Sequence, residues 1–209
     1  MMTAALTTDH SAREALLERL AISEVVQSWA LYRDAGNWER LRKTVHADGI
    51  MTATWFEGSF EEFITAIQAS WRKGSKSQHF QGGTVVEVAG SRAIAQTRMS
   101  ILVRGSLDGV AVDVNCVGLF FDRVENRNGE WRIAKRNVIY DKDSMTPVNP
   151  GEFIQLSAER LMKFPEGYRH LAYLQSANGG NVNPALPTSQ DEAKEQLVQD
   201  AYTWLRSTP

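Results

Sequence analysis

The stretch GVAVDVNCVGLFFDRVENRNGEWRIAKRNVIYD, residues 109–141, carries the strongest indication of the fold. It holds two long runs rich in β-branched and aromatic residues, 109–124 and 130–141, separated by a short turn that contains glycine. Two similar runs precede it, at 77–88 and 91–104, again with turn residues between them. Consecutive long strands joined by short turns predict an antiparallel meander rather than strands alternating with crossover helices.

The residues before the meander have helical patterns. From about Ser11 to Asp34 apolar residues recur at helical spacing, and Glu14 stands three positions after Ser11, as a capping box requires. Gly36 follows, and glycine is the usual residue just past a helix end. The other elements expected in this part are a helix at 38–45, a strand at 50–56 and a helix at 60–71.

The residues after the meander differ in character. Pro147 and Pro150 interrupt the last strand, and helical patterns return at 152–163 and 190–206. This segment is too short and too interrupted to hold a core of its own. We therefore predict a flexible leader at 1–11, one α+β domain at 12–142 and a C-terminal helical extension at 143–209 that packs on the domain.

The composition is that of an ordinary globular protein. The chain has 209 residues, of which 43% are hydrophobic and 23% charged, with a formal net charge of −2. No basic stripe is suited to a nucleic-acid backbone, and no apolar run is long enough to cross a membrane. The single cysteine, Cys116, excludes an intramolecular disulfide, and the N-terminus lacks the pattern of a secretory signal. We expect a cytoplasmic protein that binds neither nucleic acid nor membranes.

Few residues suggest chemistry. Glycine-rich phosphate loops, nucleophile elbows and paired metal-binding histidines are missing, so no metal or cofactor is expected. The glycine pair at 82–83 predicts a bulge in a strand. Of the four histidines, His10 lies in the leader, His46 is expected to end the second helix, and His170 lies in the extension.

His79 and Asp34 form the best candidate reactive pair. His79 lies near the start of the first long strand, on a polar face that indicates either solvent or a polar cavity. Asp34 ends the first helix, where a carboxylate opposes the helix dipole and needs compensation. A histidine partner would supply it.

The last two strands give a second indication of a polar cavity. Asp113 and Asn115 are expected on one face with Val117, Leu119 and Phe121, and Arg136 shares a face with Tyr140. Buried carboxylates and amides need hydrogen bonds. These residues indicate either a solvated sheet face or one end of a wet cavity.

The order of elements resembles the NTF2-like superfamily, and more narrowly its SnoaL-like branch. The matching residues are WALYRDAGNW (29–38), the DGIM start of the first strand (48–51), SQHFQGG (77–83) and the hairpin RNGEWRI (127–133). The resemblance covers about residues 12–142. It implies a strongly curved, mainly antiparallel sheet that forms a cone with the N-terminal helices around an apolar pocket.

The resemblance also implies a function. Lyases of the scytalone dehydratase and hexachlorocyclohexane dehydrochlorinase type use an aspartate after the first helix and a histidine on the strand after the third helix, without a cofactor. Asp34 and His79 occupy these two places. This implies proton abstraction from a hydrophobic, oxygenated or aromatic small molecule by a dehydratase-like lyase or an isomerase. The substrate-binding residues expected around the pair are Tyr32, Trp55, Asn115, Arg136 and Tyr140.

Two other interpretations stay open. The chain could be a non-catalytic small-molecule-binding or oligomerisation module that forms a dimer or trimer, since Met99, Ile101, Val103 and Phe120 could supply an outward apolar sheet face. Alternatively, His79 and Asp34 could form a purely structural hydrogen bond. The aromatic segment 164–173 in the extension could cover either the pocket mouth or a neighbouring subunit.

Overall fold

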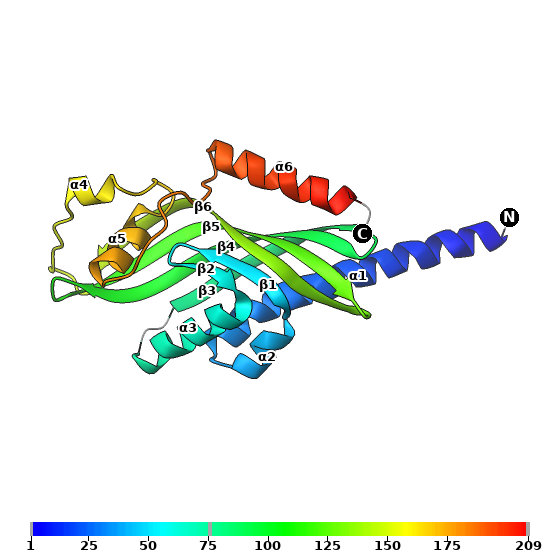
Figure 1. Cartoon of the computed structure of the whole chain (residues 1–209), viewed down its shortest axis with the longest axis horizontal. Coiled ribbons are helices and arrows are strands. Elements are labelled where there is room, and N and C mark those ends of the chain that lie inside the picture. The colour runs from blue at the N-terminus through cyan, green and yellow to red at the C-terminus, as the bar shows by residue number, and fades with distance from the viewer. Residues whose placement is uncertain (1, 75–76, 208–209) are drawn as a thin grey trace.

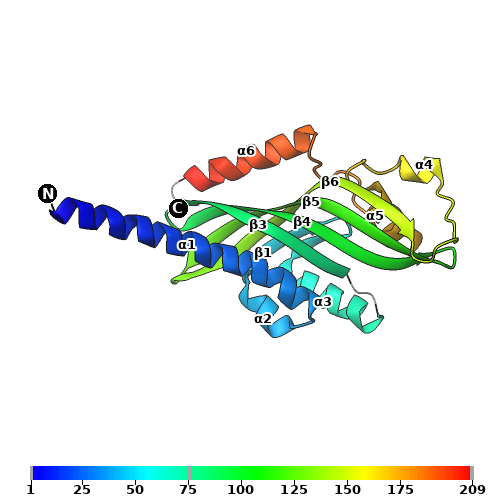
Figure 2. The same ribbon diagram turned by 180° about the vertical axis from the view of Figure 1, so that it is seen from behind.

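The protein is built on one curved, mixed β-sheet with helices on both faces (Figures 1 and 2). The structure, a computed structural model, describes residues 2–74 and 77–207, with the side chains from residue 11 onward. Six strands lie in the order β2-β1-β6-β5-β4-β3. β1 (Val45–Ala53) pairs parallel to β6 (Glu130–Pro147), whereas the other neighbours pair antiparallel. The predicted α+β class with a mainly antiparallel sheet is confirmed.

The meander consists of long strands joined by tight turns. It comprises β3 (Ser77–Ala89), β4 (Arg92–Leu107), β5 (Val110–Arg127) and β6. Each turn holds a glycine in the left-handed region, with φ of +60° at Gly90, +85° at Gly109 and +84° at Gly129. The strand register shifts between Gln81 and Thr84, so the bulge predicted at the glycine pair is confirmed.

Three helices and the short edge strand of the sheet come before the meander. They are α1 (Met2–Asp34), α2 (Trp38–Lys43), β2 (Phe56–Ser59) and α3 (Phe60–Arg72). Gly36 ends α1 with a φ of +69°. The side chain of Ser59 caps α3 and forms a reciprocal capping box with Glu62. The turn at Gly36 thus places Asp34 at the end of α1.

Two local expectations differ from the structure. α1 begins at Met2, so Ser11 lies inside the helix instead of capping it, and the helix extends into the segment expected as a leader. The prediction that His46 ends the second helix is wrong. α2 ends at Lys43, and His46 lies in β1, with Nε2 3.0 Å from the carbonyl oxygen of Glu125. Parallel pairing with β6 begins at Val45 and draws these residues into the sheet.

Different helices pack on the two faces of the sheet, and α6 covers part of the outer one (Figures 1 and 2). The inner face packs on α1, α3 and α5 (Arg169–Ala177) through the main core. The outer face carries a smaller cluster beneath α6 (Glu192–Arg206). The residues of that outer cluster are Ile94, Phe121, Ile139, Ala201 and Leu205.

The faces predicted for β4 and β5 are reversed. Met99 and Phe120, expected on an outward patch, are buried in the inner core, and Ile101 and Val103 pack against it. Leu119 and Phe121 instead face α6. Because α6 covers the outer face, both sides of β5 carry apolar residues, and the alternation that would distinguish inside from outside is lost.

The extension packs on the domain in three short helices. α4 spans only Ala158–Leu161, in place of the helix expected over 152–163, while α6 lies close to its expected position. α5 was not expected as a helix. It approaches β4 so closely that a Cβ at Gly105 would lie 2.9 Å from the side chain of Leu174.

A fully buried ion pair lies in the inner core. The guanidinium of Arg136 donates two hydrogen bonds of 2.7 Å to the carboxylate of Asp122, and both side chains are 0% exposed. The guanidinium also lies 4.2 Å from the ring centroids of Trp29 and Phe120. Burial raises the pKa of Asp122, while the charge and hydrogen bonds of Arg136 oppose that shift.

Asp122→Ala should lower the free energy of unfolding by about 3–5 kcal/mol, because it leaves the Arg136 charge buried without its partner. Urea denaturation measures this loss. The double variant Asp122→Leu with Arg136→Met should be less destabilised than the single variant. A loss below about 1 kcal/mol in Asp122→Ala would contradict this description of the core.

Candidate functional site

Asp34 and His79 are in direct contact. The backbone N–H of His79 donates to Oδ2 of Asp34 at 2.5 Å, and Nδ1 of the imidazole lies 2.9 Å from Oδ1. The contact joins the last residue of α1 to the start of β3. The structure therefore brings together the two residues proposed as the reactive pair.

Arg33 contacts both Asp34 and the start of β3. Its Nη1 lies 3.0 Å from Oδ1 of Asp34 and donates to the backbone carbonyl of Ser77 at 2.9 Å. The Asp34 carboxylate at the helix end thus has two cationic or polar partners, which offset its unfavourable position in the helix dipole. Asp34 and Arg33 keep only 18% and 13% of their side-chain surface exposed.

The charges around the pair favour an ionised aspartate and a neutral histidine. Burial alone would raise the pKa of Asp34, but the hydrogen bonds that it accepts from His79 and the charge of Arg33 hold it below its ordinary value. Burial lowers the pKa of His79; the hydrogen bond that its ring donates to Asp34 opposes this shift, and the charges of Arg33 and Arg136 add to it. With Asp34 as acceptor, Nδ1 carries the proton and Nε2 keeps a free lone pair. Nε2 has no hydrogen-bond partner within the described part of the chain.

His79 faces a small internal cavity. Its volume is about 60 Å³, which is room for a few water molecules and far less than the pocket of a typical drug-sized ligand. The walls come from α1, β1, α3, the meander and α5. Besides His79 they include Trp29, Arg33, Thr54, Trp55, Phe63, Ile101, Val103, Phe120, Tyr140, Leu171 and Gln175.

A larger cleft adjoins this cavity. It has a volume of about 520 Å³ and lies between α3, the ends of β3 and β4, and α5. The cavity and the cleft share five wall residues, which therefore form the partition between them: Arg33, Trp55, Ser77, Val103 and Gln175. A movement of these side chains would join the two spaces.

Four of the cavity residues besides His79 carry polar groups that could meet a ligand. Tyr140 Oη accepts a hydrogen bond from the backbone N–H of Thr54 at 3.1 Å, which leaves its own proton available. Nε1 of Trp29, Nε of Arg33 and Oε1 of Gln175 are buried and have no partner among the described residues. Burial raises the pKa of Tyr140 strongly, so its hydroxyl remains protonated.

Only two of the next four residues expected around the pair line the cavity. Trp55 and Tyr140 line the cavity with His79. Arg136 is buried beneath it in the ion pair with Asp122 and is not a wall residue. Asn115 is exposed in a depression on the outer face of the sheet.

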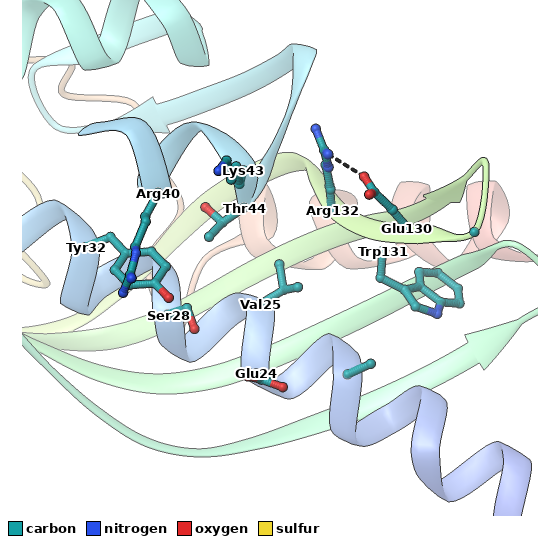
Figure 3. A pocket seen from close by; sticks show the side chains of 12 residues that line it. Glu24, Val25, Ser28, Tyr32, Arg40, Lys43, Thr44, Glu130, Trp131 and Arg132 are labelled. Carbon is teal, nitrogen blue, oxygen red and sulfur yellow. Dashed lines mark hydrogen bonds and ion pairs between the residues drawn. The ribbon is translucent and has the colours of Figure 1, made fainter. Parts of the chain in front are cut away.

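Tyr32 also lies outside the cavity. It lines a surface groove between α1, α2 and the β5–β6 turn, beneath Arg40, whose guanidinium lies 5.7 Å from the ring centroid (Figure 3). Across the groove, Arg132 pairs with Glu130 on β6 (Figure 3). Trp29, one helical turn earlier, faces His79, whereas Tyr32 packs at the edge of the same core and lines the groove instead.

Sequence reasoning named only His79, Trp55 and Tyr140 among the wall residues, and three of those it missed are instructive. Arg33 directly precedes Asp34, and a guanidinium next to a carboxylate that needs a partner at a helix end could have been predicted from the sequence to pair with it. Leu171 and Gln175 come from α5, for which no helix was expected. The extension thus contributes part of the cavity wall, one of the two roles considered for its aromatic segment.

The described residues set two limits on other kinds of site. Among them, no three or more His, Cys, Asp or Glu side chains cluster in a way that could hold a metal ion. None of the helices in the described ranges combines the length and apolar character needed to cross a membrane.

Comparison with known proteins identifies the family. Residues 14–137 match the model of the SnoaL-like domain, so the chain belongs to the SnoaL-like branch of the NTF2-like superfamily. It is 34% identical over 200 residues to pea pathogenicity protein 2 of Fusarium vanettenii, covering 90% of this chain and 86% of that protein. It is also 29% identical over 206 residues to an uncharacterised protein of Emericella nidulans, covering 91% and 87%.

Solved structures support the same fold. A scytalone dehydratase-like protein of Novosphingobium aromaticivorans aligns with a TM-score of 0.53 at 15% identity, covering 69% of this chain and 99% of that one. A type 2 hexachlorocyclohexane dehydrochlorinase aligns with a TM-score of 0.55 at 16% identity, covering 69% and 97%. The fold and the family expected from the sequence are confirmed.

The pKa of the His79 ring should lie below its ordinary value of 6.5, because burial disfavours the charged ring more strongly than Asp34 favours it. Asp34→Asn should lower this pKa further, since it removes the negative charge that favours imidazolium. Side-chain NMR of His79 across the pH range measures both values. Asp113→Asn, a change in an exposed carboxylate paired with Arg104 on the outer face, should leave them unchanged. A wild-type pKa at or above 6.5 would contradict this electrostatic balance.

Proposed function

We propose that the protein is a cofactor-independent lyase or isomerase in which His79 removes a proton from a hydrophobic, oxygenated small molecule. The observation that carries the proposal is the two-point contact of Asp34 with His79, which leaves Nε2 unprotonated beside a cavity. The likeness to a dehydratase-like fold and to a dehydrochlorinase fold supports it, although fold alone does not fix function.

The chemistry starts at Nε2 of His79. This nitrogen takes a proton from a carbon next to a carbonyl or a leaving group, and the Asp34 carboxylate stabilises the imidazolium that forms. In an elimination, the electron pair of the broken C–H bond forms a C=C bond, and the leaving group departs with the electron pair of the bond that joined it to carbon. In an isomerisation, the imidazolium returns the proton to a different carbon.

Tyr140 is the proposed partner of the developing negative charge. Its hydroxyl remains protonated and already accepts from Thr54, so its proton is free to bond a substrate oxygen. Such a donor in a dry site typically contributes about 3–4 kcal/mol to transition-state stabilisation. Trp55 and Phe63 would form the apolar surroundings of the substrate, their ring centroids lying 5.6 Å apart.

A non-catalytic binding module is the second candidate. Its ligand would occupy the cleft of about 520 Å³, because the His79 cavity, about 60 Å³, admits a molecule of ordinary size only if the partition residues move. On this reading Asp34 and His79 tie α1 to β3 and do no chemistry.

Self-association is compatible with either function. Phe80, Val85 and Leu102 on the outer face of β3 and β4 are 72%, 65% and 39% exposed. We propose this face as the contact between copies in a homo-oligomer, replacing the residues expected there from the sequence. A cytoplasmic location remains a prediction.

His79→Ala should reduce turnover by about 10²- to 10⁴-fold and Asp34→Asn by a similar order, with both variants folded by circular dichroism. The assay follows scytalone and hexachlorocyclohexane by NMR in D₂O, where elimination or exchange of a carbon-bound proton is visible. These compounds are chosen because the structural neighbours are described as acting on them.

The matched controls are His46→Gln and Asp113→Asn, which change a histidine and an aspartate outside the cavity walls. Both should retain wild-type turnover. Full activity of His79→Ala on a compound that the wild type converts would exclude His79 as the base.

A further inference from the structure

We infer that Gln175, on α5, is a positioning residue of the His79 site, with Oε1 accepting a hydrogen bond from an O–H or N–H group of the ligand. The inference rests on the proposed function only in placing the ligand in the His79 cavity. Gln175 lies outside residues 14–137, the part of the chain that matches the family model. It is therefore a feature of the extension.

Gln175 lies at the boundary between the two spaces of the site. It belongs both to the wall of the His79 cavity and to the wall of the adjoining cleft. A ligand that extends from the cleft to His79 crosses the partition of which Gln175 is a part. This position suits a residue that selects and orients what enters.

The amide oxygen of Gln175 lacks a protein partner. Oε1 is buried and makes no hydrogen bond with any described residue, although a buried acceptor normally has one. Nε1 of Trp29, whose side chain is 1% exposed and lines the same cavity, also has no partner there. An unused acceptor and an unused donor around one cavity indicate a polar ligand rather than a purely apolar one.

α5 is held firmly, so the position of Gln175 is built into the fold. The carboxylate of Asp143, 0% exposed, accepts at 2.7 Å from the backbone N–H groups of both His170 and Leu171, in the first turn of α5. Its other oxygen lies 2.7 Å from Nδ1 of His170. Asp143 thus supplies the helix cap that the preceding residue, Tyr168, does not provide.

A second contact fixes the same end of the helix to the cavity wall. The ring of Tyr168 packs on that of Tyr140, with the centroids 4.7 Å apart, and Tyr168 Oη donates to the carbonyl of Asn183. Since Tyr140 itself lines the cavity, the helix that carries Gln175 is fixed relative to the proposed catalytic groups.

The polar groups define the ligand chemistry. Tyr140 offers a proton, Nε2 of His79 offers a lone pair, and Gln175 offers an acceptor oxygen. A hydroxyl group both donates and accepts, so it can satisfy Gln175 while bonding a donor of the site. We therefore assign to Gln175 the recognition of a hydroxyl-bearing substrate.

The test compares two small probes of nearly equal shape, phenol and fluorobenzene, of which only phenol donates a hydrogen bond. Dissociation constants are measured by NMR titration of the His79 ring in the wild type and in Gln175→Met. The wild type should prefer phenol, and Gln175→Met should reduce this preference by about tenfold, the effect of one hydrogen bond to a buried acceptor. Gln199→Met, an exposed glutamine on α6, should keep the full preference.

The ratio of the two dissociation constants distinguishes the loss of one hydrogen bond from a structural change, because a general loosening of α5 would weaken the binding of both probes alike. Gln175→Asn, which keeps a shorter amide, should retain part of the preference. An unchanged ratio in Gln175→Met, or a wild type that binds phenol no better than fluorobenzene, would overturn the inference. Neither result bears on the base, since loss of turnover in His79→Ala is measured separately.

Discussion

The carboxylate of Asp34 is the group on which the candidate site depends. Placed at the end of a helix, it opposes the helix dipole, and it is mostly buried, so it requires partners. It obtains them from the backbone and ring of His79 and from Arg33. These bonds fix the end of α1 against the start of β3, and they also fix the orientation of the imidazole. The interaction that positions the helix on the sheet is thus the one that prepares the proposed base.

A second pair in the protein has the same geometry. In both pairs one carboxylate oxygen meets Nδ1 of a histidine and the other accepts from the backbone N–H of that same residue. The pairs differ in which member is the more deeply buried. The ring of His79 is 8% exposed and faces the cavity, whereas the ring of His170 is 24% exposed while its partner Asp143 is 0% exposed. The first arrangement suits chemistry at the ring, and the second suits capping of a helix.

Much of the fold could be predicted from local signals. Glycines at tight turns and long β-branched runs defined the meander, and the helix-end carboxylate pointed to a partner such as His79. The faces of β5 could not be predicted, because α6 buries the outer side and makes Phe121 as apolar a position as Phe120. Asn115 was therefore expected inside although it lies outside. α5 was missed for a related reason: its cap, Asp143, lies more than twenty residues earlier in the chain, so no local capping signal marks the helix.

The proposed chemistry depends on one protonation state, that of the His79 ring. Long-range ¹H–¹⁵N NMR of the imidazole at pH 7.5 distinguishes the two neutral tautomers directly. The geometry with Asp34 predicts a proton on Nδ1 and an unprotonated Nε2 on a ring that lines the cavity. A ring with its proton on Nε2 would contradict the central claim, because that nitrogen could then accept no proton from a substrate.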